Sequence, residues 1–194
     1  DSLCTFDVLV TITEPTVLGG SITAQSNVDC NGNATGEVTI EGNGGTMPYT
    51  YSLDGGAFGV SGTFGSLSAE DYTITVQDDS LCTFDVLVTI TEPTILGGGI
   101  ITQTNVDCNG ASTGEVTIEG SGGTAPYQYA LDGGAFGVSG IFGSLSAGDY
   151  TVTVQDDSLC TFDILVTITE PTALGGSITA QSNVDCNGNA TGEV

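Results

Sequence analysis

The sequence contains no lysine, arginine or histidine, whereas 24 of its 194 residues are Asp or Glu, so its formal net charge is -24. Basic side chains are what displaces counterions from phosphates, and their absence excludes the usual mode of nucleic-acid binding. The same absence disfavours docking on anionic lipid. Carboxylates of one sign keep protein molecules apart and soluble. We therefore expect no nucleic-acid partner.

Long hydrophobic runs are also missing. No run approaches the about 20 apolar residues that span a bilayer, so we expect no membrane insertion. Hydrophobic residues nevertheless make up 39% of the chain, and the acidic residues stand singly between Val, Ile, Leu and Tyr. Disordered chains have few such residues. The composition therefore predicts a folded protein.

The lack of histidine and lysine also removes the common general bases and nucleophile activators of enzymes. Paired carboxylates remain a formal route to glycoside hydrolysis, with Glu37 and Glu41 as candidates. On a strand, a spacing of four residues separates their side chains by about 13 Å, which exceeds the usual distance between catalytic carboxylates. The sequence therefore predicts no catalytic residues and a protein that is not an enzyme.

What the chain does have is a repeat. The segment from Asp1 to Thr16 returns nearly letter for letter at Asp79 and again at Asp157. The third copy stops at Val194, inside the part that matches Gly36–Val38. We therefore expect this chain to be a section of a longer repetitive protein.

Short apolar alternations separated by Gly, Asn, Asp and Pro fill each period and predict β-strands joined by turns. In Tyr72–Gln77, for example, Tyr72, Ile74 and Val76 share one face. Six or seven strands in about 78 residues are typical of a compact sandwich, whereas a solenoid repeats every 20 to about 50 residues. We predict an all-β fold of tandem immunoglobulin-like β-sandwich repeats, each of about 78 residues.

Proline marks the predicted domain borders, because it cannot donate to a strand ladder. A border after each Glu-Pro-Thr gives four parts, which are listed here. We expect residues 1–16 to be the closing strand of a preceding repeat, 17–94 and 95–172 to be complete repeats, and 173–194 to be the truncated first strand of a following repeat.

Six cysteines recur in two contexts, at positions 4, 30, 82, 108, 160 and 186. An even count without CxxC spacing favours disulfides over zinc and indicates an oxidising compartment. Loop entropy does not choose between a bond inside one repeat and a bond from Cys4 to Cys30. Since bonds within one domain are more usual, we predict Cys30 with Cys82 and Cys108 with Cys160. Cys4 and Cys186 would then pair outside this section.

The acidic turns are the best candidate metal sites, and Asp29, Asp107 and Asp185 are further acids in the Asn-rich loop. Asp78 with Asp79, and Asp156 with Asp157, are the best local clusters. Calcium needs six to eight oxygen ligands, which backbone carbonyls of the Gly-rich loops could complete. We expect no required cofactor, with calcium at these four residues as the sharper hypothesis and solvated turn acids as the plainer one.

The sequence resembles the SprB repeat family, found as tandem repeats in giant surface adhesins of gliding Bacteroidota. The motifs that carry the resemblance lie at Val28–Gly32, Gly44–Tyr51, Leu67–Asp78, Leu81–Thr83 and Val88–Pro93. The resemblance covers essentially the whole chain. It implies secretion to the cell surface and a role in adhesion, gliding motility or an extracellular fibre. The family often has Gly-Cys where this chain has Leu81-Cys82.

Three serines, Ser2, Ser80 and Ser158, match an O-glycosylation acceptor pattern of secreted glycoproteins in the same bacterial group, where a glycan would space the fibre. We predict a structural, extracellular repeat protein that forms a filament or an adhesin stalk with copies of itself. The alternative is a calcium-dependent module that binds surface polysaccharide.

Overall fold

The computed structural model describes Cys4 and residues 6–194, and the regular elements in this part of the chain are all strands. The strands of the first repeat are β1 (Gly19–Ser26), β2 (Gly36–Asn43), β3 (Thr50–Leu53), β4 (Thr63–Leu67), β5 (Asp71–Gln77) and β6 (Thr83–Thr89). Those of the second are β7 (Gly97–Thr104), β8 (Gly114–Ser121), β9 (Gln128–Leu131), β10 (Ile141–Leu145), β11 (Gly148–Gln155) and β12 (Thr161–Ile168). Within the described residues, no helix is long and apolar enough to cross a membrane.

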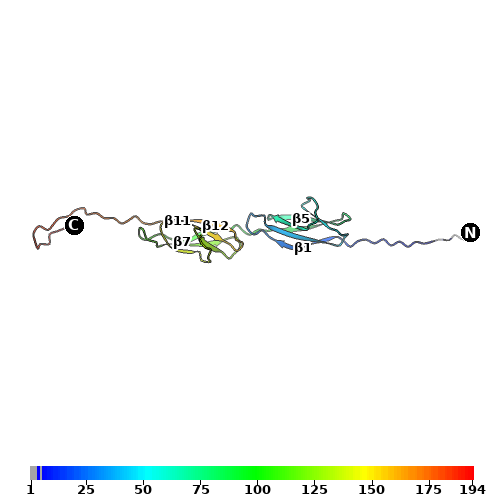
Figure 1. Ribbon diagram of the computed structural model, residues 1–194, viewed down its shortest axis with the longest axis horizontal. Coiled ribbons are helices and arrows are strands. Elements are labelled where there is room, and N and C mark those ends of the chain that lie inside the picture. The colour runs from blue at the N-terminus through cyan, green and yellow to red at the C-terminus, as the bar shows by residue number, and fades with distance from the viewer. Residues whose placement is uncertain (1–3, 5) are drawn as a thin grey trace. The chain divides into compact units, whose positions relative to one another are not determined.

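Each repeat forms two antiparallel three-stranded sheets. In the first repeat their orders are β1-β2-β4 and β3-β5-β6, and in the second β10-β8-β7 and β12-β11-β9. In the lettering of immunoglobulin domains these are the orders A-B-E and C-F-G. Figure 1 shows β1 and β5 in different layers of the first repeat. The predicted all-β, immunoglobulin-like tandem fold is confirmed.

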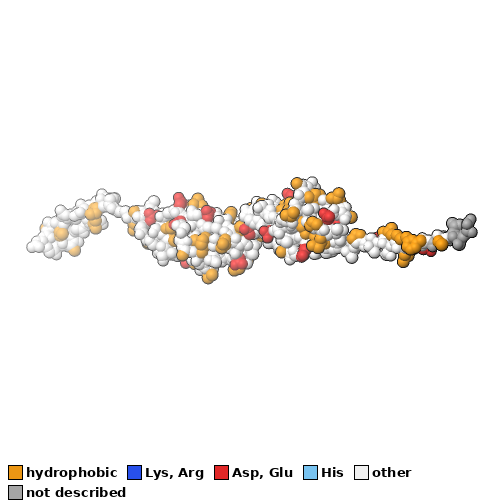
Figure 2. All heavy atoms as spheres, turned by 45° about the vertical axis from the view of Figure 1, so that its right-hand side comes forward, with side chains coloured by type: hydrophobic (Ala, Val, Ile, Leu, Met, Phe, Trp, Pro, Cys, Tyr) orange, Lys and Arg blue, Asp and Glu red, His pale blue; other side chains and the backbone are white. Residues whose placement is uncertain are grey.

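The core lies between the two sheets and follows from the alternation of the central strands β2 and β5. In β2, Val38 and Ile40 point inward, whereas Glu37 and Glu41 are exposed. In β5, Ile74 and Val76 are completely buried against them. Because successive side chains of a strand point to opposite faces, one alternating run places apolar groups inside and carboxylates in water. Figure 2 shows the acidic side chains dispersed over the face in view.

Two tyrosines fix the first repeat's geometry through their hydroxyl groups. Tyr72, near the start of β5, donates to the carbonyl oxygen of Ser68 at 3.2 Å. A tyrosine at this place whose hydroxyl bonds back to the backbone is typical of immunoglobulin-like domains. The Tyr51 hydroxyl accepts a hydrogen bond from the buried amide of Gly42 at 3.1 Å. Both arrangements recur in the second repeat, at Tyr150 and Tyr129.

The chain forms two compact units, and their limits do not coincide with those of the two sequence repeats. The first contains residues 1–96 together with the loops 122–126 and 156–160, and the second contains residues 97–121, 127–155 and 161–194. Two loops that the sequence assigns to the second repeat thus belong to the first unit. The borders predicted after Glu-Pro-Thr stay a prediction.

The residues before the first repeat and after the second, 6–16 and 173–194, form no named strand. Residues 6–16 have no ladder partner, and Phe6 is 89% exposed. Residues 173–194 contain one isolated bridge, between Ser182 and Glu193. A strand needs a neighbour for its backbone groups. The assignment of these segments to a preceding and a following repeat stays a prediction.

Candidate functional site

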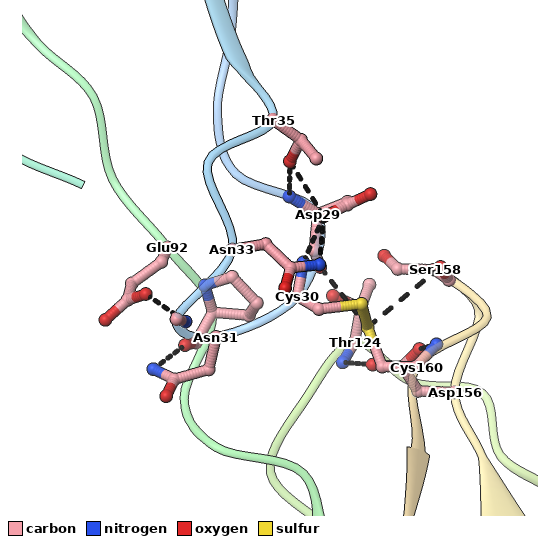
Figure 3. Close-up of a disulfide and its surroundings, with 12 residues drawn as sticks. Asp29, Cys30, Asn31, Asn33, Thr35, Glu92, Thr124, Asp156, Ser158 and Cys160 are labelled. Carbon is pink, nitrogen blue, oxygen red and sulfur yellow. Dashed lines mark hydrogen bonds between the residues drawn. A yellow bond between two sulfur atoms is a disulfide. The ribbon is translucent and has the colours of Figure 1, made fainter. Parts of the chain in front are cut away.

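The most distinctive site is a disulfide between Cys30 and Cys160, whose Cα atoms lie 5.8 Å apart (Figure 3). That distance lies within the usual range for a disulfide. The two cysteines are 130 residues apart in sequence. Cys30 belongs to the first sequence repeat and Cys160 to the second, yet both lie in the first compact unit. The bond therefore connects two successive repeats covalently.

The loop that carries Cys30 is built around the carboxylate of Asp29. Its Oδ1 accepts hydrogen bonds from the Thr35 hydroxyl at 2.7 Å, the Cys30 amide at 2.6 Å and the Asn33 side chain at 3.2 Å. The Thr35 hydroxyl in turn accepts from the Asp29 amide. These bonds, led by that from Thr35, hold the pKa of Asp29 below its ordinary value. The loop therefore presents Cys30 from a fixed turn.

The same loop is tied to the end of its own repeat. The amide of Gly32 donates to Oε2 of Glu92 at 2.6 Å, and the Asn31 side chain donates to the carbonyl oxygen of Pro93 at 3.0 Å. Figure 3 shows Asn31 and Glu92 side by side next to the Cys30 turn. Glu92 and Pro93 follow β6 and precede the next repeat. Cys30 is thus held where the chain leaves the first repeat.

The second cysteine of each repeat sits in a different loop, built around a buried aspartate. Asp78 is 3% exposed. Its Oδ1 accepts from the amides of Ser80 and Cys82, and its Oδ2 accepts from the amide of Thr46 at 2.9 Å. Gly45, which directly precedes Thr46, donates its amide hydrogen to the carbonyl oxygen of Thr16. Cys82 is thus held where the chain enters the first repeat.

The two cysteines of one repeat therefore lie at opposite ends of its sandwich, and the predicted bond between Cys30 and Cys82 is wrong. Strand β6 runs from beside Cys82 towards Glu92, to which the Cys30 loop is tied. Ten residues of extended chain span about 30 Å, whereas a disulfide requires Cα atoms within about 7 Å.

Two other pairings are also wrong, because Cys30 and Cys160 are bonded to each other. These are the predicted bond between Cys108 and Cys160 and the alternative bond between Cys4 and Cys30. Among the described residues, the free cysteines are Cys4, Cys82, Cys108 and Cys186, all exposed. The sequence carried no signal for the observed pair, because the spacing of cysteines does not tell which end of a sandwich a loop occupies.

The predicted calcium ligands do not converge in pairs. Both oxygens of Asp78 face backbone amides, and Asp156 accepts in the same way from Thr124 and Cys160. Asp79 and Asp157 are exposed. The part of the chain that is described contains no group of three or more His, Cys, Asp or Glu suited to a metal ion. Calcium binding at these residues stays a prediction.

The glycan candidates lie beside the second cysteine of each repeat. Ser80 is exposed and Ser158 is half-buried next to the disulfide, as Figure 3 shows. Ser2 lies outside the described residues. Modification of these serines stays a prediction.

Acid should weaken the first repeat through Asp78 and Asp29. The hydrogen bond from the Thr46 amide is the main cause that keeps the pKa of Asp78 below its ordinary value of 3.8. Burial acts in the opposite direction. A carboxylate with a depressed folded pKa stabilises the protein above the unfolded value, and this contribution is lost as pH falls through the folded value. We expect the free energy of unfolding to fall as pH drops below 3.8.

Denaturant titrations between pH 6 and pH 2 would measure this, in high salt so that repulsion among carboxylates is screened. The Asp78→Asn variant should show a shallower fall than the natural chain. Equal slopes for the two proteins would contradict the assignment.

Comparison with known proteins gives one family. The model described as "SprB repeat" matches residues 22–58 and 100–136. Both matched stretches run from β1 or β7 through the first-cysteine loop to the region after β3 or β9. The family resemblance of the sequence is therefore confirmed. No curated protein matches the chain.

Among solved structures, the chain is similar to three N-terminal domains of the outer capsid protein Hoc of bacteriophage RB49, with 15% identity and a TM-score of 0.45. The similarity covers 78% of this chain and 59% of that one. A C-terminal fragment of intimin, solved with the intimin-binding domain of its receptor, has 15% identity and a TM-score of 0.38, with 76% and 64% covered. Domains 4–9 of the surface layer protein SbsC have 13% identity and a TM-score of 0.33, with 88% and 32% covered.

Proposed function

From the match of the SprB repeat model to residues 22–58 and 100–136, we infer that the chain is part of an extracellular repeat protein of the adhesin type. In this proposal the folded repeats follow one another as a filament or as the stalk of an adhesin at the bacterial surface. Their task is mechanical, to hold a more distant part of the protein away from the cell.

The observation that carries the proposal is the disulfide between Cys30 and Cys160. Disulfides of this kind persist in oxidising environments outside the cytoplasm and are rare inside it. This one also joins two repeats, which is useful where repeats must stay together under load. The family match supports the same compartment.

Surface composition supports the proposal as well. A formal charge of -24 without any basic residue makes neighbouring arrays repel one another. The absence of lysine and arginine also removes every cleavage site for proteases of trypsin specificity. Both properties suit a protein that is exposed to the medium.

Immunogold labelling of intact cells with an antibody against this chain tests the proposal. We expect gold particles outside the cell, in rows along fibres or at a distance from the envelope. Permeabilised cells serve as the control for antibody access. Labelling that appears only after permeabilisation would contradict an extracellular role.

A further inference from the structure

Each repeat contains both kinds of loop that the disulfide joins, one with the first cysteine and one with the second. The Cys108 loop repeats the ties of the Cys30 loop to the end of its repeat, since Gly110 donates its amide to Glu170 at 2.6 Å and Asn109 donates to the Pro171 carbonyl oxygen. The amide of Asp107 also donates to the Thr113 hydroxyl, as that of Asp29 does to Thr35. The loop of a free first cysteine is therefore anchored at the exit of its repeat by the same backbone ties as the loop of the bonded one.

The second-cysteine loops match in the same way. The Cys82 amide donates to Asp78 and the Cys160 amide to Asp156, each at 2.9 Å. Leu81 and Leu159, just before these cysteines, both have a positive φ, of 63° and 65°. Cys82, which is free and exposed, is therefore held as the bonded Cys160 is held.

We propose that the first cysteine of each repeat bonds to the second cysteine of the next repeat, and that these bonds, with the short segments that join them, carry tension past most of each folded sandwich. Cys30 with Cys160 is one such bond. Cys108 takes the second cysteine of a following repeat, and Cys82 takes the first cysteine of a preceding one.

The covalent path explains why this pairing limits extension. With Cys30 bonded to Cys160, the 130-residue separation between them is bypassed, and tension on the two ends of this chain acts only on residues 1–30 and 160–194. In an array, the path would run from Cys160 along the chain to Cys186, and from there across the next disulfide. In every two successive repeats, only one such short segment would bear the tension. Only a small part of the backbone could therefore be extended.

Each bond forms by a balanced exchange of two thiols with a disulfide donor. The donor is a thiol oxidoreductase in its disulfide form or a small-molecule disulfide. The thiolate of one cysteine attacks the donor to give a mixed disulfide, and the thiolate of the other cysteine then displaces the donor. The donor leaves as two thiols, having taken up the two electrons and two protons that the cysteines lose.

Single-molecule stretching of this chain, held at its two ends, tests the tension path. Adding a reductant under load should lengthen the unfolded chain by the 130 residues that the bond encloses, about 450 Å at about 3.5 Å per residue. A Cys30→Ser variant should reach the full length without reductant. The matched control, Cys108→Ser, should behave as the natural chain does. A shorter step that corresponds to the segment between Cys30 and Cys82, or no step, would overturn the proposal.

Peptide mapping of a variant with both Cys4→Ser and Cys186→Ser, in which each outer fragment keeps one cysteine, tests the partners independently of mechanics. A protease that cleaves after Glu, but not before Pro, leaves the cysteines in three fragments, 1–37, 71–115 and 120–193. Without reduction, 1–37 should stay linked to 120–193. A link from 1–37 to 71–115 would overturn the assignment.

The native protein tests the extension to the whole array. After purification with thiols blocked, Cys82 and Cys108 should take up an alkylating reagent only after reduction, because their partners are then engaged. Alkylation of both before reduction would refute the array of bonds. Immunogold labelling bears on cellular location alone, so the proposed function and this inference can fail separately.

Discussion

Replacing Ile74 by alanine will lower the free energy of unfolding of the first repeat by about 2–5 kcal/mol. The Ile74 side chain is completely buried between the sheets, and its strand β5 pairs with both β3 and β6. Removing it leaves a cavity that its rigid neighbours fill only in part. A small domain has a total stability of about 5–15 kcal/mol, so this loss is a large share. Denaturant titration followed by circular dichroism measures it.

Leu87→Ala provides the matched control on the neighbouring strand. Leu87 is 77% exposed on the outer face of β6, so its truncation should change stability by no more than about 0.5 kcal/mol. Losses of equal size in the two variants would show that the core does not lie where the structure places it.

Replacing Gly45 by alanine will destabilise the loop that holds the second cysteine. Gly45 has a φ of 57°, a left-handed conformation that costs an alanine about 1–2 kcal/mol. A Cβ at this position would also lie 2.6 Å from Oδ2 of Asp78, the atom that accepts the Thr46 amide. Relieving such overpacking costs about 1–3 kcal/mol more. Thermal and denaturant unfolding measure the sum.

Gly55→Ala separates the two contributions. Gly55 has a φ of 72°, and a Cβ there would meet no atom within 4 Å. It should therefore show the backbone cost alone, and Gly45→Ala should be clearly the less stable variant. Equal stability would mean that the Asp78 carboxylate moves aside freely and does not organise the loop.

The central strands β2 and β5 could be predicted from sequence because their apolar residues alternate with polar ones. Tyr72, Ile74 and Val76 predicted the inward face of β5, and the last two are completely buried. The role of the Gly-rich loop at Gly44 and Gly45 in holding the Asp78 carboxylate was not predicted. That role depends on a contact across 32 residues of sequence, which no local pattern reports.

The cysteine pairs were predicted wrongly for a related reason. Sequence showed two cysteines per repeat in two fixed contexts, and it indicated disulfides. Pairing depended on the ties of the Cys30 loop to Glu92 and of the Cys82 loop to Thr46, which place the two cysteines at opposite ends of one sandwich. The general preference for bonds within one domain suggested a pair that the length of the strands forbids.

Residues 1–16 and 79–94 are identical in sequence, and together they separate what sequence determines from what tertiary structure decides. Sequence determines the alternation, and with it which side chains a strand would bury. In the second copy, β5 offers a ladder to Thr83–Thr89, and Val88 and Ile90 become buried. Residues 6–16 of the first copy form no strand, and Val10 and Ile12, which correspond to Val88 and Ile90, stay exposed. A strand is completed by hydrogen bonds to a neighbour, and only the folded repeat supplies one.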